Sequence, residues 1–153
     1  MRITHLCFGG PFTDGFSYQD NLLPKYHKKL GHEVTIIASN LSFDKEGKVI
    51  SVKAPNTYSN EYGITVTRLL YKRPVKFFSR LRRFIGTYEA ITESRPDVLF
   101  VHGCQFLDID KVVKYKKKHP NVIVYVDNHA DFSNSARNFI SYYFIHKILW
   151  RRC

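Results

Sequence analysis

Polar residues that can exchange protons and hydrogen bonds follow one apolar run of the chain directly. The run 122–126 is followed by Asp127, Asn128, His129 and Asp131. Open α/β sheets bind ligands beyond the carboxyl ends of their strands, which is where these side chains would lie. A neutral imidazole can hydrogen-bond a hydroxyl group, and a neighbouring carboxylate can select its tautomer. We expect His129 to be catalytic and the other three to contact the substrate.

A structural interpretation of this segment stays open. Asp127 and Asn128 are also residues that shape turns, and Ser133 or Ser135 is a suitable N-cap for a following helix. We expect the two serines to have this structural role, and His129 to have the functional one.

A glycine-rich loop follows the first apolar run of the chain. Glycines there allow a tight turn and a close approach to a ligand, and a following helix offers free N–H groups to an anion. The loop does not match GxGxxG, and the second run ends in Ser39 and Asn40 without an acidic residue, so NAD binding is disfavoured. The glycines could also form only a turn. The candidate substrate-binding residues of the loop are Gly9, Gly10, Asp14, Gly15 and Phe16.

One further histidine, His102, ends the run 98–101 and would border the same crevice, either as a wall residue or as a substrate contact. The other histidines show no clustering that suggests a metal; they are His5, His27, His32, His119 and His146. The spacing in the segment 127–131 is not a recognised ligand pattern. We therefore expect neither a metal nor a bound cofactor in this chain.

The charge of the chain is strongly basic. Twenty-four Lys and Arg against thirteen Asp and Glu give a net charge of +11, which favours an anionic partner. The segment 68–83 holds basic residues and no acidic one, with aromatic residues between them. It is either an anionic-membrane contact or a solvated helix face over an apolar stripe. The candidate contacts are Lys72, Arg73, Lys76, Arg80, Arg82 and Arg83. No nucleic-acid-binding motif accompanies the charge, so nucleic acid is not the expected partner.

The elements that must position these residues alternate between strands and helices. Apolar, β-branched runs predict buried parallel strands at 3–8, 34–38, 98–101 and 122–126. Helical periodicity covers 18–30, with Ser17 as N-cap and Gly31 as its stop, and also 77–91 and 108–118, where Ile109, Val112 and Val113 face inward. Extra strands are expected near 49–52 and 64–67. The pattern predicts an α/β fold with a doubly wound, mainly parallel Rossmann-like sheet and helices on both faces.

The last apolar segment, 139–150, is aromatic and apolar around most of a helix. Such a helix needs cover, and it is shorter than the roughly 18 residues of a membrane span. We expect a second domain or a partner chain to pack there. Three cysteines without ligand spacing and an amino end without a signal peptide predict a cytoplasmic chain, peripheral to the inner face of the plasma membrane at most.

Three features together carry a family resemblance: the glycine loop, a helix ending in LGHEVTII (30–37), and the PDVLFVH strand (96–102). The chain resembles the amino-terminal domain of glycosyltransferase family 4, retaining enzymes with the GT-B fold. The resemblance is strongest over residues 1–40 and 95–135 and implies one Rossmann-like domain over 1–153. It also implies that His129 matches a family histidine beside the donor sugar.

That resemblance implies a division of labour between two domains. The amino-terminal half binds a glycan or lipid-linked acceptor, and the other half binds the nucleotide-sugar and carries the paired glutamates. That second half would need about 150–200 further residues. We expect the 153 residues alone to be inactive.

Two alternatives to this function remain. The chain could be a stand-alone membrane-associated subunit that recruits a separate catalytic glycosyltransferase chain. It could also be a nucleic-acid-binding α/β module, which would show steep salt dependence of binding.

Overall fold

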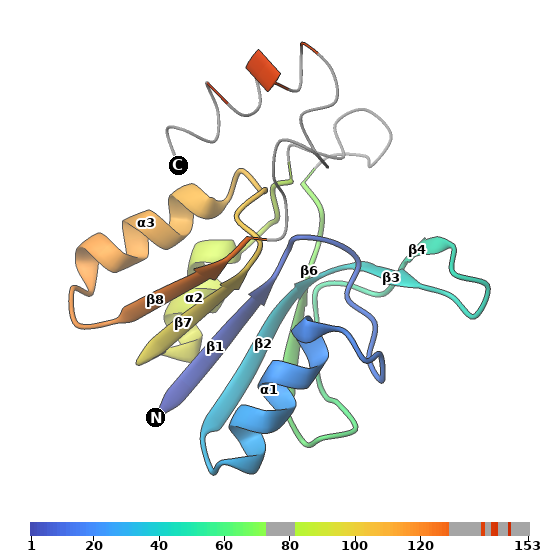
Figure 1. Cartoon of the computed structure of the whole chain (residues 1–153), viewed down its shortest axis with the longest axis horizontal. Coiled ribbons are helices and arrows are strands. Elements are labelled where there is room, and N and C mark those ends of the chain that lie inside the picture. Colours follow the sequence, from blue (N-terminus) through green and yellow to red (C-terminus); the bar gives the residue numbers. More distant parts are fainter. Residues whose placement is uncertain (73–81, 129–138, 140–141, 144–146, 148–153) are drawn as a thin grey trace.

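The computed structural model describes residues 1–72, 82–128, 139, 142–143 and 147. A mixed six-stranded sheet, ordered β5-β6-β2-β1-β7-β8, lies at its centre (Figure 1). Its strands are β1 Arg2–Cys7, β2 Glu33–Ser39, β5 Asn56–Ser59, β6 Thr65–Leu69, β7 Val98–His102 and β8 Ile123–Asp127. A separate antiparallel pair is formed by β3 Leu41–Phe43 and β4 Val49–Ser51. The expected α/β class is confirmed, whereas the doubly wound Rossmann-like arrangement stays a prediction.

The four predicted apolar runs form neighbouring strands in the order β2-β1-β7-β8. The predicted burial is wrong for β8, an edge strand of the described sheet, whose Ile123, Tyr125 and Val126 are about half exposed. β1 pairs in parallel with β2 and with β7, and β8 continues the parallel order beside β7. The extra strand expected near 64–67 is β6, which pairs in parallel with β2. β5 pairs antiparallel with β6 and makes the sheet mixed.

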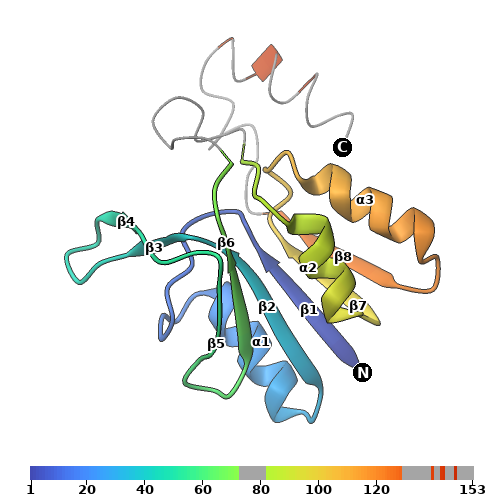
Figure 2. The same ribbon diagram turned by 180° about the vertical axis from the view of Figure 1, so that it is seen from behind.

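Three helices cover the two faces of the sheet. α1 Gln19–Lys29 lies on the face toward the viewer in Figure 1, whereas α2 Thr87–Ser94 and α3 Ile109–Lys118 lie on the other face, which Figure 2 shows. Gly31 ends α1 in a left-handed conformation with φ of 83°, as expected. The N-cap of α1 is Tyr18 rather than Ser17.

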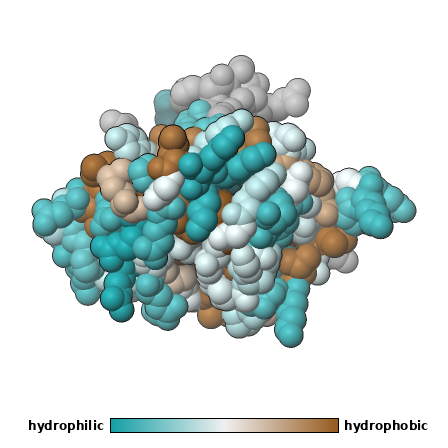
Figure 3. All heavy atoms as spheres, turned by 90° about the horizontal axis from the view of Figure 1, so that it is seen from below, coloured by the Kyte–Doolittle hydropathy of each residue, from teal (hydrophilic) through white to brown (hydrophobic). Residues whose placement is uncertain are grey.

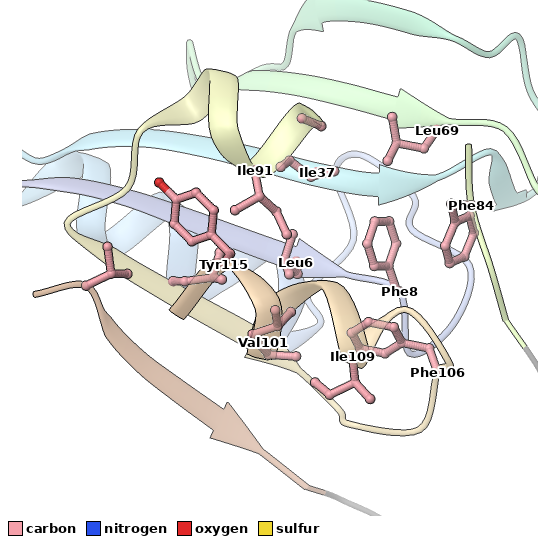
Figure 4. Close-up of a cluster of buried hydrophobic side chains, with 14 residues drawn as sticks. Leu6, Phe8, Ile37, Leu69, Phe84, Ile91, Val101, Phe106, Ile109 and Tyr115 are labelled. Atoms are coloured by element: carbon pink, nitrogen blue, oxygen red, sulfur yellow. The ribbon is translucent and has the colours of Figure 1, made fainter. Parts of the chain in front are cut away.

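Alternation along the strands divides the core between these two faces. Leu6 and Phe8 of the β1 segment pack under α2 and α3, whereas Cys7 packs with Val34 and Ile36 on the α1 side. Figure 4 shows the first cluster; its labelled members are Leu6, Phe8, Ile37, Leu69, Phe84, Ile91, Val101, Phe106, Ile109 and Tyr115. Burying each such side chain contributes about 1.5–3 kcal/mol.

The helix predicted over 77–91 is confirmed from Thr87, where α2 begins, and is wrong over residues 82–86. The backbone N–H of Phe84 donates to the buried carboxylate of Asp108, and that of Ile85 donates to the carbonyl of Leu70. These bonds replace the helical pattern, and Gly86 starts α2 in a left-handed conformation with φ of 85°. The remainder, residues 77–81, lies outside the described residues.

The helix predicted over 108–118 agrees with α3, but one of its inward residues was wrong. Ile109 and Val112 are buried as expected, whereas Val113 is 38% exposed and Tyr115 is buried in its place. The helical period places residue 115 on the same stripe as 112, and the aromatic ring fills the space beside α2.

In the described part of the chain, no helix has the length and apolar character that crossing a membrane requires. The predicted helix over 139–150 falls mostly outside the described residues. Within this range the structure describes only Phe139, Tyr142, Tyr143 and Lys147.

Candidate functional site

The carboxyl ends of β1, β7 and β8 gather several of the predicted site residues. His102 and Asp127 are opposite each other in the parallel register of β7 and β8. The backbone N–H of Gly103 donates to Asp127 Oδ1 at 2.6 Å. Asn128 is the next residue and is exposed. The end of β7 and the end of β8 are therefore fastened to each other by a side chain.

The glycine loop touches this same edge. A Cβ on Gly9 would lie 2.9 Å from the carbonyl oxygen of His102, closer than a side chain allows. Gly103, with φ of 72°, also packs against Gly9, since a Cβ on Gly103 would lie 3.8 Å from the Cα of Gly9. Gly10 has nothing within 4 Å of a Cβ position. Gly9 therefore has a packing reason to be glycine, while Gly10 leaves open space at the strand ends.

Both ring nitrogens of the buried His102 have polar neighbours. Its Nδ1 lies 3.2 Å from Asp127 Oδ2 and 3.5 Å from Asp20 Oδ1, on α1. Its Nε2 lies 2.9 Å from His5 Nδ1, in the middle of β1. The predicted wall residue is thus a hydrogen-bonding centre that connects β1, β8 and α1.

The structure adds two histidines that the sequence analysis did not place in the site. His5 is fully buried, and its Nε2 lies 3.0 Å from Nδ1 of His27 on α1. Burial, followed by the neighbouring His102 and His27, lowers the pKa of His5 to about 2. Burial also lowers the pKa of His27, with His32 the next cause. The sequence does show His5 as a histidine inside an apolar strand. It does not show the strand order that places His5 beside His102.

The later part of the glycine loop lies toward the β5–β6 edge of the sheet. Asp14 Oδ2 accepts hydrogen bonds from the Tyr58 hydroxyl at 2.6 Å and from Arg68 Nη2 at 3.2 Å. The N–H of Gly15 donates to Glu61 Oε1, and Phe16 stacks on Phe43 of β3. These contacts belong to β3, β5, β6 and their loops. The structure thus brings Gly9 to His102, but not Asp14, Gly15 and Phe16. The carbonyl of Gly10 accepts from Ser39 Oγ of β2 at 3.3 Å.

Arg68, which begins the basic segment 68–83, is not a solvated residue. Its side chain is 4% exposed, and Nη1 donates to the carbonyls of Phe12 at 2.6 Å and Ser39 at 3.1 Å. Its Nε donates to the Tyr58 hydroxyl at 3.0 Å. This arginine joins the glycine loop to β2 and β6, and its charge is paired internally with Asp14.

The predicted anion contacts have different surroundings. Lys72 is exposed. Arg82 donates to the carbonyl of Phe8 at 3.3 Å, and burial lowers its pKa. Arg83 forms ion pairs with Asp110 at 3.4 Å and Asp108 at 3.5 Å. Arg82 and Arg83 therefore have internal partners that an anionic surface would have to share.

Several predicted residues lie outside the described residues. They are Arg73, Lys76, Arg80, His129, Asp131, Ser133 and Ser135. Their roles stay predictions. Among the described residues, no group of three or more His, Cys, Asp or Glu side chains has the arrangement of a metal site.

A hollow of about 650 Å³ lies at the opposite end of the sheet from these residues. Its lining includes Arg2, Arg95, Asp97 and His119, at the amino ends of β1 and β7. Figure 3 views the molecule from this end and shows hydrophilic residues over much of it. The Arg2–Asp97 ion pair, at 2.7 Å, holds the pKa of Asp97 at about 2. We place the candidate site at the carboxyl edge because its buried titratable groups are linked to one another.

Comparison of the chain with family models, with curated proteins and with solved structures gave no match.

Proposed function

We propose that this chain is the acceptor-side part of a retaining glycosyltransferase that transfers a sugar from a nucleotide-sugar to a glycan or lipid-linked acceptor. The nucleotide-sugar would be bound by a further domain or a partner chain. The described chain is an α/β fold with the parallel order β6-β2-β1-β7-β8 and helices on both faces of the sheet. The proposal takes this sheet as one Rossmann-like half of a GT-B fold. The sequence resemblance supplies the family, and the sheet supports the placement of its site.

The observation that carries the proposal is the contact between the glycine loop and the end of β7. Gly9 lies against the His102 carbonyl, and Asp127 holds the N–H of Gly103. The carboxyl ends of three parallel strands thereby form one edge with exposed Asn128 beside it. Such an edge is where open α/β sheets bind ligands.

Each described residue would have a distinct role at this edge. The backbone around Gly10, which no side chain crowds, would let acceptor oxygens approach closely. Asn128 would hydrogen-bond sugar hydroxyls through its amide. Asp127 and His102 would hold the backbone at Gly103 in place and supply the polar floor of the site.

A membrane contact on the cytoplasmic side belongs to the same proposal. Lys72 is exposed, and each basic residue near an anionic bilayer can contribute about 1 kcal/mol. A lipid-linked acceptor would then be presented from the surface on which the chain rests. The alternative, a stand-alone subunit that recruits a catalytic chain, would use the same acceptor site.

Acceptor binding can be tested by NMR on the 153-residue chain. A polyprenyl-diphosphate-linked disaccharide in micelles, or a soluble oligosaccharide, should shift the amide signals of Gly10, Gly103 and Asn128. Empty micelles serve as the control, and the amides around Asp97 at the far end should not move. Shifts confined to the far end, or none with either probe, would contradict the acceptor site.

The catalytic assignment needs the donor-binding part as well. In the active transferase, His129→Ala should lower kcat by about tenfold or more, the usual range for loss of a proton-transferring or orienting imidazole. His119→Ala, a change of an exposed histidine, is the matched control. Equal activity of the two variants would remove His129 from the site.

A further inference from the structure

Three histidines form one continuous hydrogen-bonded row through the α1 face of the sheet; we call His27, His5 and His102 the histidine chain. His27 Nδ1 lies 3.0 Å from His5 Nε2, and His5 Nδ1 lies 2.9 Å from His102 Nε2. The row ends at the carboxylates of Asp127, 3.2 Å from His102 Nδ1, and Asp20, at 3.5 Å. Its members come from α1, β1, β7 and β8.

The carboxylates determine the tautomer of every ring in the chain. An ionised carboxylate only accepts, so His102 must carry its proton on Nδ1, and Nε2 of the neutral ring is then an acceptor. Nδ1 of His5 must therefore donate to it, which leaves His5 Nε2 to accept from Nδ1–H of His27. The two hydrogen bonds between the rings point from α1 toward Asp127, and Nε2 of His27 keeps a lone pair at the α1 end of the row.

We propose that the histidine chain conducts protons from solvent at α1 to the Asp20 and Asp127 carboxylates at the candidate site. A proton binds Nε2 of His27, and the Nδ1 proton of each ring passes to the next acceptor. Asp127 takes the proton that leaves His102. One proton enters and one arrives, and each ring changes from the Nδ1–H to the Nε2–H tautomer. The rings regain their first tautomers when Asp127 gives a proton back along the same row to solvent, so the row conducts protons in both directions.

The exposure along the chain fits this role. His27 is half-buried, His5 is fully buried, and the Asp20 and Asp127 side chains are 31% and 15% exposed. Both ends therefore approach solvent, while the middle is sealed by the sheet. A row that served only packing would not need an imidazole at His5, since an apolar side chain could fill the space without burying two polar nitrogens.

The proposal concerns only described residues and goes beyond the transferase role, because it holds for any substrate at this edge. The first test is the tautomer of each ring, read from long-range ¹H–¹⁵N spectra of the ¹⁵N-histidine-labelled chain at pH 7.5. His5, His27 and His102 should all be Nδ1–H. An Nε2–H form of His5 or His102 would overturn the proposal.

The second test follows the ring proton of His5 as it exchanges with solvent. Conduction predicts exchange at least tenfold faster than that of the backbone amide of Leu6 in the same strand, because no opening of the sheet is required. His27→Phe removes the entry point and should slow ring exchange at least tenfold, with the Leu6 amide unchanged. His32→Phe, beside His27 but outside the chain, should have no effect.

A purely structural chain gives the opposite pattern. The His5 ring proton would then exchange at the rate of the Leu6 amide, and His27→Phe would leave it equal or faster, because a lost hydrogen bond can only loosen the sheet. If His27→Phe did not fold, the wild-type comparison of ring and amide exchange would decide alone. Acceptor binding is measured separately by amide shifts, so either proposal can fail without the other.

Discussion

Two buried polar clusters lie on the α1 face of the sheet and have opposite character. The Arg68 cluster, made of Arg68, Asp14 and Tyr58, holds a permanent cation among fixed acceptors, which include the carbonyls of Phe12 and Ser39. The histidine chain consists of three rings joined by two hydrogen bonds, with His5 in the middle. The first cluster fastens a loop; the second can change the tautomers of its rings without losing its geometry.

This difference indicates that the Arg68 cluster stabilises the fold, whereas the histidine chain can take part in proton transfer. Arginine stays charged at any pH a protein meets, so its network can only be intact or broken. Histidine changes charge near neutral pH, and burial here shifts that change to lower pH. Variants of the Arg68 cluster should therefore affect stability, and variants of the histidine chain should affect pH dependence.

The largest expected effect is the loss of the Arg68 side chain. Arg68→Met removes the buried cation that pairs with Asp14 and donates to three backbone carbonyls, and the free energy of unfolding should fall by about 3–5 kcal/mol. Urea denaturation followed by circular dichroism measures it. Arg2→Met breaks an exposed ion pair with Asp97 and should leave the midpoint nearly unchanged. If the two variants lost the same free energy of unfolding, the Arg68 cluster would contribute no more to stability than an exposed ion pair.

The next largest effect concerns the packing of the glycine loop against His102. Gly9→Ala forces a methyl group to within 2.9 Å of the His102 carbonyl and should cost about 2 kcal/mol. Gly10→Ala meets open space and should change stability by less than about 0.5 kcal/mol. Thermal unfolding of both variants gives the comparison. If Gly10→Ala were the more damaging, the packing of the loop on β7 would be misjudged.

A pH effect separates the two clusters directly. The pKa of His5 is about 2 in the folded chain and near 6.5 when unfolded, so only the unfolded chain gains a proton as the pH falls below 6.5. The stability that His5 contributes is thus complete above pH 6.5 and should decrease by about 1.5 kcal/mol between pH 6.5 and 5. The lowered pKa of His27 acts in the same direction.

Denaturation curves at several pH values check this slope. His5→Asn should remove the His5 part of it, whereas His119→Gln, at an exposed position, should retain it. A slope that survives His5→Asn unchanged would mean that the buried imidazole is not the origin of the pH dependence.

The smallest effect concerns one hydroxyl of the Arg68 cluster. Tyr58 donates to Asp14 and accepts from Arg68, and burial raises its pKa to about 12. Tyr58→Phe should lower stability by about 1 kcal/mol, the usual net value of a hydrogen bond. Tyr26→Phe, at an exposed tyrosine, should be neutral. Equal effects of the two changes in the same denaturation assay would show that the hydroxyl adds nothing to the cluster.

The amino-acid sequence by itself determined the elements of this protein. The apolar runs 3–8, 34–38, 98–101 and 122–126 are strands, and the period of 108–118 is a helix, because local patterning decides which backbone conformation buries apolar side chains. The failure at 82–86, by contrast, has a tertiary cause. The N–H groups of Phe84 and Ile85 bond to Asp108 and Leu70, partners that are distant in the sequence.

Which polar residues meet was decided only by the tertiary structure. His5 and His102 are 97 residues apart, and the pairing of β1 with β7 brings their rings to 2.9 Å. Arg68, which begins the basic segment 68–83, is a buried arginine because the glycine loop folds over β6. Periodicity reports which way a side chain faces within its own element, but the neighbour across the sheet follows from strand order, which long-range pairing alone establishes.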